Sequence, residues 1–97
     1  MPVEIVWSAL ARTRLREIRA YVAPDKPKAA ERLAMRIVAV VEALRNHPHL
    51  GQIGVEPGIR ELVIGGTPYI VLYLAQGQRV VISIILHGAR RQMRKVR

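Results

Sequence analysis

Three strand-like runs joined by two tight turns span residues 59–87, and they limit the possible folds of the chain more than any other feature. The runs are residues 59–64, 69–73 and 80–87, and each is rich in Val, Ile, Leu or Tyr. Gly65-Gly66 and Gly77 stand in the connections, where glycine allows the backbone angles that short hairpin turns require. Because runs this close in sequence usually pair with each other, we predict an antiparallel meander of three strands.

The N-terminal residues predict a strand followed by a helix. Residues 3–7 alternate at period two, as in a strand with one buried face. Ser8 suits the N-cap of the helix, because its hydroxyl can accept a hydrogen bond from an unpaired backbone N–H. In this helix one face is apolar and another is lined with arginine. The apolar residues are Ala11, Leu15, Ile18 and Val22, and the arginines are Arg12, Arg16 and Arg19.

A second helix should pack against the first as a helical hairpin. Pro24 cannot continue the first helix, whereas Pro27 suits the first turn of the next one. We predict this helix from Pro27 to Asn46, followed by a loop rich in Gly and Pro over residues 47–58. Its buried stripe is Ala30, Leu33, Ala34, Ile37, Val41 and Leu44. The element order β-α-α-β-β-β predicts an α+β fold, with a helical hairpin packed on a small curved antiparallel sheet.

Length and composition predict one globular domain spanning residues 1–97. A chain of 97 residues rarely contains two cores, and 51% hydrophobic with 24% charged residues is a globular composition. The absence of cysteine excludes disulfides and thiolate metal sites. The first residues do not resemble a signal peptide, and no apolar run approaches the roughly 20 residues of a membrane span. We therefore expect a cytoplasmic protein that does not associate with membranes.

The formal net charge of +9 favours an acidic partner: nucleic acid, an anionic membrane surface or an acidic protein segment. Cations are concentrated after His87, where no acidic residue follows. They are Arg90, Arg91, Arg94, Lys95 and Arg97. A basic tail of this kind is also compatible with a simple solvated chain end.

The sequence gives little support to a metal site, a phosphate-binding loop or catalysis by a serine nucleophile. His47, His49 and His87 are the only histidines, and Pro48 separates the first two without suitably spaced carboxylates. Histidines at the end of a helix more often complement its dipole. Gly65-Gly66 has strands on both sides and lacks the helix N-terminus of a phosphate loop. We expect neither a metal nor a cofactor.

A ribonuclease-type site is a stronger alternative. Transfer of a phosphoryl group from a 2′-hydroxyl needs a general base, a general acid and cations that stabilise the transition state. The residues that supply these groups here are His87, Glu56 or Glu61, Arg60, Arg90 and Arg91. Tyr69 and Tyr73 can stack on a base or donate a proton, but their period-two spacing equally predicts core or cross-strand partners.

The order and spacing of several short motifs resemble the RelE/ParE superfamily of bacterial toxins from type II toxin–antitoxin pairs. The resemblance covers nearly the whole chain and implies two helices on a small curved sheet. The motifs are Trp7 with Ala9, Ile18-x-x-Tyr21-Val22, Pro27-x-Ala29-Ala30, Leu44-x-x-His47-Pro48-x-x-Gly51, Arg60-Glu61-Leu62, Tyr69-x-Val71-x-Tyr73 and Val81-x-x-x-x-Leu86-His87-Gly88-Ala89-Arg90.

The resemblance implies one of two activities. RelE-like members cut messenger RNA on the ribosome, whereas ParE-like members poison DNA gyrase and are not nucleases. RelE-like enzymes typically carry an arginine where Ile70 stands, and an aromatic residue in the C-terminal segment, which has none after His87. Nucleases with a catalytic histidine followed by tyrosine also differ, because Gly88 follows His87. The sequence is closer to the ParE pattern.

We therefore expect a ParE-like, non-enzymatic toxin that arrests growth by poisoning DNA gyrase. Its expected target-contacting residues, clustered at the rim of the sheet, are Arg60, His87, Arg90 and Arg91. The alternative is a RelE-like ribosome-dependent mRNA endoribonuclease, with catalytic residues His87, Arg60 and Arg90. A third hypothesis is a degenerate toxin without activity. In each case the resemblance implies a cognate antitoxin, ParD-like or similar, that folds over the toxin in a hetero-oligomer.

Overall fold

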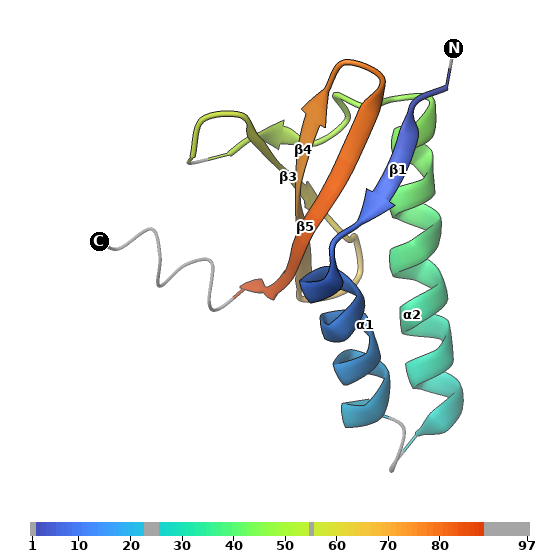
Figure 1. Ribbon diagram of the computed structural model, residues 1–97. Helices are drawn as coiled ribbons and strands as arrows, with labels where there is room; N and C mark the ends of the chain where they lie inside the picture. The colour runs from blue at the N-terminus through green and yellow to red at the C-terminus, as the bar shows by residue number, and fades with distance from the viewer. Residues whose placement is uncertain (1, 23–25, 55, 89–97) are drawn as a thin grey trace.

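A computed structural model of the chain describes residues 2–22, 26–54 and 56–88. Two helices, α1 and α2, lie side by side against one face of a five-stranded sheet (Figure 1). The helical bounds are α1 Ala9–Val22 and α2 Pro27–Glu42, followed by the 3₁₀ helix η1 Ala43–Arg45. The strands are β1 Glu4–Trp7, β2 Gln52–Ile53, β3 Ile59–Val63, β4 Tyr69–Gln76 and β5 Arg79–His87. The predicted α+β class with a helical hairpin on a small sheet is confirmed.

The sheet is mixed, so the prediction of an antiparallel sheet is correct for β2 to β5 and wrong for β1. Its strand order is β1-β5-β4-β3-β2, and β3, β4 and β5 form the predicted antiparallel meander. However, β1 runs parallel to β5, with Trp7 opposite Ile82. Period-two alternation identifies a strand but carries no information about its direction or partner. The short β2, within the predicted loop, pairs with β3 through two residues that show no such alternation.

Both predicted hairpin turns are present and contain glycine in a left-handed conformation. Gly66 has a φ of 79° and Gly77 a φ of 56°. Only glycine adopts such angles without a steric penalty. These turns make the connections of the meander short, which keeps its three strands adjacent.

A bulge in β5 changes which residues face the helices. Tyr73 lies opposite Ile82 and Leu72 opposite Ile84, so Ser83 has no partner on β4. The extra residue reverses the alternation from this point onward. The prediction that Ile84 and Leu86 share a face with Val80 and Ile82 was therefore wrong.

The helices follow their predicted stripes. The Ser8 hydroxyl caps α1 by accepting a hydrogen bond from the Ala11 N–H at 2.9 Å. Buried residues of the two helices are Ala11, Ile18, Ala30, Ala34, Ile37 and Val41, and Leu44 of η1 is also buried; Leu15 and Leu33 are partly buried. The Val22 side chain lies outside the described set. The last turn of the predicted second helix is 3₁₀, a common way for a helix to end.

The sheet buries side chains on both faces. The main core lies between the helices and the sheet and includes Ile64, Val71, Tyr73, Val80 and Ile82. A smaller cluster of Ile70, Leu72 and Leu86, with Ile59 and Ile84 packed against it, lies on the other side. The alternation of side chains along β4 explains why there are two clusters, because successive residues of a strand point to opposite faces of the sheet.

Candidate functional site

Arg60, one of the predicted functional residues, holds the loop between η1 and β2. It lies opposite Tyr73 on β4. Its Nη1 donates a hydrogen bond to the Gly51 carbonyl at 2.8 Å and approaches the His49 carbonyl at 3.4 Å. A guanidinium placed in this way satisfies carbonyl groups that would otherwise lack a partner. In this structure the cation therefore stabilises a loop.

Tyr73 fastens the same loop from the core. Its buried hydroxyl accepts a hydrogen bond from the Gly51 N–H and donates one to the Pro48 carbonyl, both at 2.8 Å. Burial raises the pKa of Tyr73, against smaller opposing effects of the Gly51 hydrogen bond and the Arg60 charge. A phenol with its ordinary pKa is already protonated at neutral pH, and this shift extends the protonated range to higher pH. Of the two interpretations of Tyr73 from sequence, proton donor or core residue, the geometry supports the core residue.

Gly51 completes this arrangement by lacking a side chain. A Cβ at Gly51 would lie 2.7 Å from Tyr73 Cε1 and 2.9 Å from the Glu61 carbonyl oxygen. Such contacts are too short for any other residue without displacement of the loop. The loop, Tyr73 and Arg60 thus form one packed unit.

His87 ends β5 and lies opposite Tyr69 at the start of β4. The two rings meet edge to face, with centroids 5.6 Å apart and planes at 81°. His87 is exposed, while Tyr69 is partly buried against the main core. Tyr69 is therefore the cross-strand partner that its spacing predicted, and His87 is presented at the end of the strand.

The structure does not bring Arg60 and His87 together. Their partners Tyr73 and Tyr69 are four residues apart on β4, or about 13 Å at about 3.3 Å per residue. The Arg60 guanidinium is also bonded to the loop of residues 49–51. Arg90 and Arg91, the other predicted site residues, lie outside the described residues.

Within residues 2–22, 26–54 and 56–88, no three His, Cys, Asp or Glu side chains are grouped so that they could bind a metal ion. In the same ranges, no helix combines the length and apolar character needed to cross a membrane.

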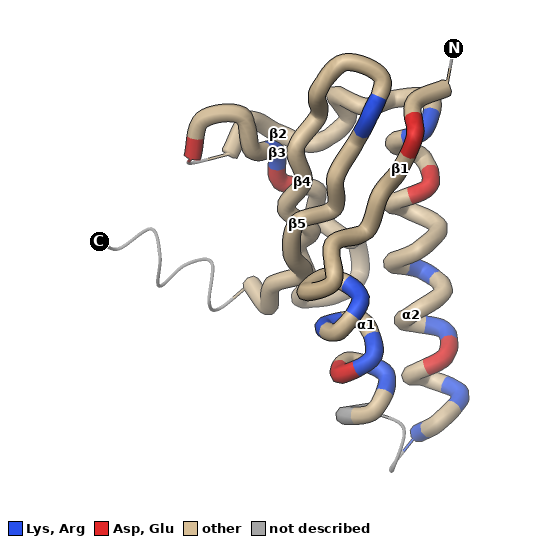
Figure 2. Tube along the Cα trace, viewed as in Figure 1, with Lys and Arg blue, Asp and Glu red and all other residues tan. Residues whose placement is uncertain are grey.

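The helices form a groove that combines apolar and cationic residues, which we call the hairpin groove. It is lined by Trp7, Arg12, Leu15, Arg16 and Val38. These residues come from β1, α1 and α2, so three elements shape the surface. Arginines are spread along α1 (Figure 2). Arg12 and Arg16 are exposed, whereas Trp7 and Leu15 are partly buried in the main core.

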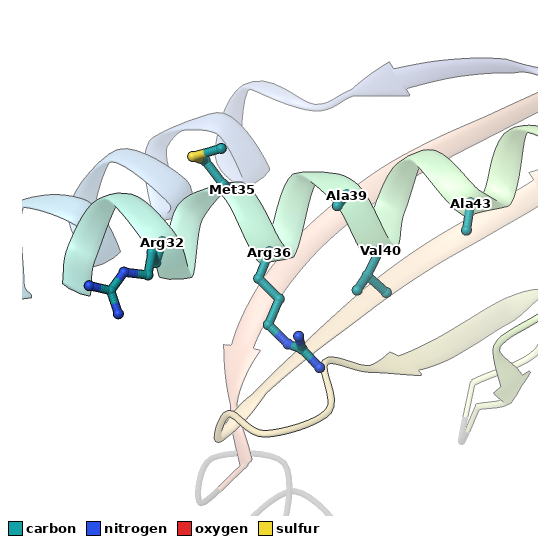
Figure 3. A pocket seen from close by; sticks show the side chains of 6 residues that line it. All are labelled: Arg32, Met35, Arg36, Ala39, Val40 and Ala43. Atoms are coloured by element: carbon teal, nitrogen blue, oxygen red, sulfur yellow. The ribbon is translucent and has the colours of Figure 1, made fainter. Parts of the chain in front are cut away.

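A second groove, which we call the flank groove, follows the other side of α2 (Figure 3). Its lining residues are Arg32, Met35, Arg36, Ala39, Val40 and Ala43. Arg36 extends from α2 to the turn between β3 and β4, where its Nε donates a hydrogen bond to the Gly65 carbonyl at 2.6 Å. This arginine joins the helix to the turn.

The site residues predicted from sequence lie in the C-terminal half, and none of them lines either groove. Two signals were available. The stripe of Arg12, Arg16 and Arg19 on α1 was recognised but not assigned a role. Met35 and Val38 lie off the buried stripe of α2, and they are 63% and 36% exposed. Large apolar side chains beside exposed arginines are typical of binding surfaces.

Comparison with known proteins agrees with this fold. The chain superposes on a structure titled "Chromosomal ParDE TA system from P. aeruginosa" with a TM-score of 0.80 and 22% identity, covering 88% of this chain and 95% of the other. It is 44% identical to the protein Y4kP of Sinorhizobium fredii over 84 residues, which cover 87% of this chain and 86% of that protein. It is 33% identical to Toxin RelE2 of Caulobacter vibrioides over 87 residues, or 90% and 97% of the two chains.

The fold thus places the chain among proteins with the architecture seen in a toxin–antitoxin system. Residues 5–92 match the family described as ParE toxin of the type II toxin–antitoxin system parDE. The chain belongs to this ParE toxin family. It is the toxin of a type II toxin–antitoxin pair, and an antitoxin is its expected partner.

Proposed function

We propose that this toxin arrests growth by binding and poisoning DNA gyrase, without acting as a nuclease, and that its cognate antitoxin neutralises it. The observation that carries the proposal is the position of Arg60. Its guanidinium is hydrogen-bonded to the loop of residues 49–51, about 13 Å along the sheet from the position of His87. A nuclease would need this cation beside its histidine at one phosphate.

The environment of Ile70 supports the same proposal. Ile70 stands where RelE-like nucleases typically carry an arginine, and it is buried in the smaller apolar cluster with Leu72 and Leu86. An arginine here would need room and a partner in that cluster. The surroundings of Ile70 thus suit an apolar residue, and none of the residues named in that cluster could pair with a cation.

A binding function requires no proton transfer from the proposed target-contacting residues. His87 is exposed at the end of β5, and Arg90 and Arg91 follow it in the sequence. We retain these three residues as candidates for gyrase contact, together with Arg60, which would act by holding its loop. The proposal places the toxin in the cytoplasm, where gyrase works.

The test compares gyrase poisoning with message cleavage for the same purified toxin. We expect the toxin to inhibit supercoiling and to accumulate cleaved DNA–gyrase complexes, and the His87→Ala variant to be at least about tenfold weaker. Ile53→Ala, at a site 81% exposed on β2, is the control and should be as active as the wild type. Unaltered gyrase at toxin concentrations that arrest growth would refute the proposal.

A RelE-like endoribonuclease is the second candidate, favoured by the exposed His87 in edge-to-face contact with Tyr69. In this case primer extension on translated messages should reveal cuts at defined codon positions. Those cuts should disappear with His87→Ala. Growth arrest without such cuts would reject the nuclease.

A further inference from the structure

We propose that Arg36 of α2 is a positioning residue for the target-contacting end of the toxin, and that it acts through the turn between β3 and β4. This turn, residues 64–68, is called the β3–β4 turn below. The inference rests on the proposed function, in which His87 contacts the target. Arg36 lies in the helical layer, on a different element from every residue so far assigned to target contact.

The tip of the β3–β4 turn has little stiffness of its own. Gly65 and Gly66 are adjacent at the tip, both are exposed, and Gly66 has a φ of 79°. Glycine restricts the backbone less than any other residue, so two in succession leave the tip with many accessible conformations. A contact from outside the turn is therefore needed to fix where its tip lies.

Arg36 provides this contact. Its Nε donates a hydrogen bond to the Gly65 carbonyl at 2.6 Å (Figure 3), and none of the ion pairs among the described residues involves Arg36. A Cβ placed on Gly65 or on Gly66 would lie 3.6 Å or 3.9 Å from the Nη2 of Arg36, so the guanidinium lies beside both glycines. Hydrogen bonds from a charged donor are stronger than those between neutral groups. The side chain thus binds the tip of the turn to α2.

Hydrogen bonds inside the turn hold its second half. The Thr67 hydroxyl donates to the Ile64 carbonyl at 2.8 Å and accepts from the Tyr69 N–H at 3.1 Å. The Ile64 N–H donates to the Tyr69 carbonyl at 3.0 Å, and the Ile64 side chain is buried in the main core. Pro68 lies between two residues of this network. Its carbonyl therefore has a defined position while the network is intact.

The chain that follows His87 is bonded to this turn. The Gly88 N–H donates to the Pro68 carbonyl at 2.6 Å. A Cβ on Gly88 would lie 3.2 Å from that carbonyl oxygen, so the absence of a side chain eases this close approach. The next residue, Tyr69, meets the His87 ring edge to face. Pro68 and Tyr69 together thus hold the His87 ring and the backbone directly after it.

Contacts therefore connect α2 to His87 through the turn. Among the described residues, the bond from Arg36 to Gly65 is the one hydrogen bond that joins the β3–β4 turn to the helical layer. Arg36 is exposed and contributes nothing to the main core. Its removal should consequently loosen the turn, Gly88 and His87 locally and leave the core folded.

The first measurement follows these positions by NMR of the purified toxin. In Arg36→Ala the Gly88 amide should exchange roughly three- to tenfold faster than in the wild type, the change expected from loss of one hydrogen bond. The ring resonances of His87 should shift with it. The amide of Leu72, in the middle of β4, should exchange at the wild-type rate, which identifies the effect as local.

The second measurement is gyrase poisoning by the same variants. Arg36→Ala and Thr67→Ala should each require at least about fivefold more toxin to accumulate cleaved DNA–gyrase complexes, because a less ordered contact surface binds more weakly. Thr67→Ser keeps the hydroxyl and should stay within about twofold of the wild type, and Arg36→Lys, which keeps a charged donor, should recover part of the loss. The matched control is Arg32→Ala, which removes a cation from the same flank groove but no bond to the turn, and it should also stay within about twofold.

Three results would overturn the proposal. The first is an unchanged Gly88 exchange rate and unchanged His87 resonances in folded Arg36→Ala. The second is a change in both with full toxin activity, in an assay where His87→Ala is weakened. The third is an Arg32→Ala variant as weak as Arg36→Ala, which would assign the effect to charge. Failure of the gyrase proposal is recognised separately, because the wild type would then leave gyrase unaltered; the NMR measurement needs no target, and growth arrest then measures activity.

Discussion

At the scale of single residues, a cation and a phenol predicted to be functional are occupied by structural contacts. Arg60 and Tyr73 bind the same short loop from two sides, through the carbonyls of Pro48 and Gly51 and the Gly51 N–H. Residue type alone does not distinguish a catalytic arginine or tyrosine from one that satisfies backbone groups. Only the position of the loop makes this distinction.

Removal of the Tyr73 hydroxyl should destabilise the protein. Tyr73→Phe leaves the Gly51 N–H and the Pro48 carbonyl without this partner, and we expect the free energy of unfolding to fall by about 1–3 kcal/mol. Tyr69→Phe is the control, since the known contact of Tyr69 is through its ring to His87, and it should change stability by less than about 0.5 kcal/mol. Urea denaturation at neutral pH measures both. Equal stabilities of the two variants would contradict the assigned role.

Tyr73 also predicts a pH dependence at high pH. Because burial raises the pKa of Tyr73 above its ordinary value of 10.0, the folded state retains a proton that the unfolded state releases. The stabilisation is therefore complete below the ordinary pKa and is lost as pH rises through the folded pKa. As pH rises from about 10, the stability of the wild type should therefore fall more steeply than that of Tyr73→Phe. Parallel curves would exclude this contribution.

At the scale of secondary structure, one serine connects the start of α1 to the bulge in β5. The Ser8 hydroxyl accepts the Ala11 N–H at 2.9 Å and donates to the Ser83 carbonyl at 2.8 Å. The bulge leaves Ser83 unpaired on β4, so its carbonyl is available to the helix cap. The cap was predictable from the sequence, but the bulge was not, because residues 80–86 are apolar apart from Ser83 and do not show which residue is the extra one.

Replacement of Ser8 should cost more than the loss of an ordinary helix cap. Ser8→Ala removes the cap and the bond to Ser83, and we expect a loss of about 1–3 kcal/mol in the free energy of unfolding. Thr13→Ala, which removes an exposed hydroxyl bonded to Arg16, should change stability by no more than about 0.5 kcal/mol. Thermal and urea unfolding followed by circular dichroism measure the difference. A Ser8→Ala protein as stable as Thr13→Ala would show that the link contributes little.

In the molecule as a whole, exposed arginines and an apolar groove lie together on the helical layer. The net charge of +9 was visible in the sequence, but its relation to apolar surface was not. Packing of α1 against α2 and β5 places Arg12 and Arg16 in the same groove as Trp7 and Val38. The result is a surface able to attract an acidic partner over distance and to bury its apolar side chains on contact.

This charge should make association with the antitoxin dependent on salt. Electrostatic attraction accelerates encounter and is screened beyond about 10 Å at 0.1 M salt. We expect the association rate constant, measured by stopped flow, to fall roughly tenfold between about 50 mM and about 500 mM NaCl. Arg12→Glu/Arg16→Glu should flatten this dependence, whereas Arg79→Glu should flatten it less. A rate independent of salt would indicate that the net charge does not guide binding.

Most of the secondary-structure elements and turns of this protein could be predicted from its sequence. These elements are the helical stripes, the Ser8 cap, the glycine turns and the three-strand meander. They depend on residues that are neighbours in the chain, whose periodicity and backbone preferences can be read from the sequence. Their order, with the motifs around Trp7, Tyr69 and His87, was also sufficient to indicate the toxin superfamily.

Four features could be learned only from the tertiary structure. They are the direction of β1, the face of the sheet on which Ile84 and Leu86 lie, the separation of Arg60 from His87 and the presence of the hairpin groove. Each depends on residues far apart in the chain, such as Trp7 and Val38, which line one groove, or Ser8 and Ser83, which share a hydrogen bond. Packing geometry sets such contacts, and no local pattern of residue types encodes it.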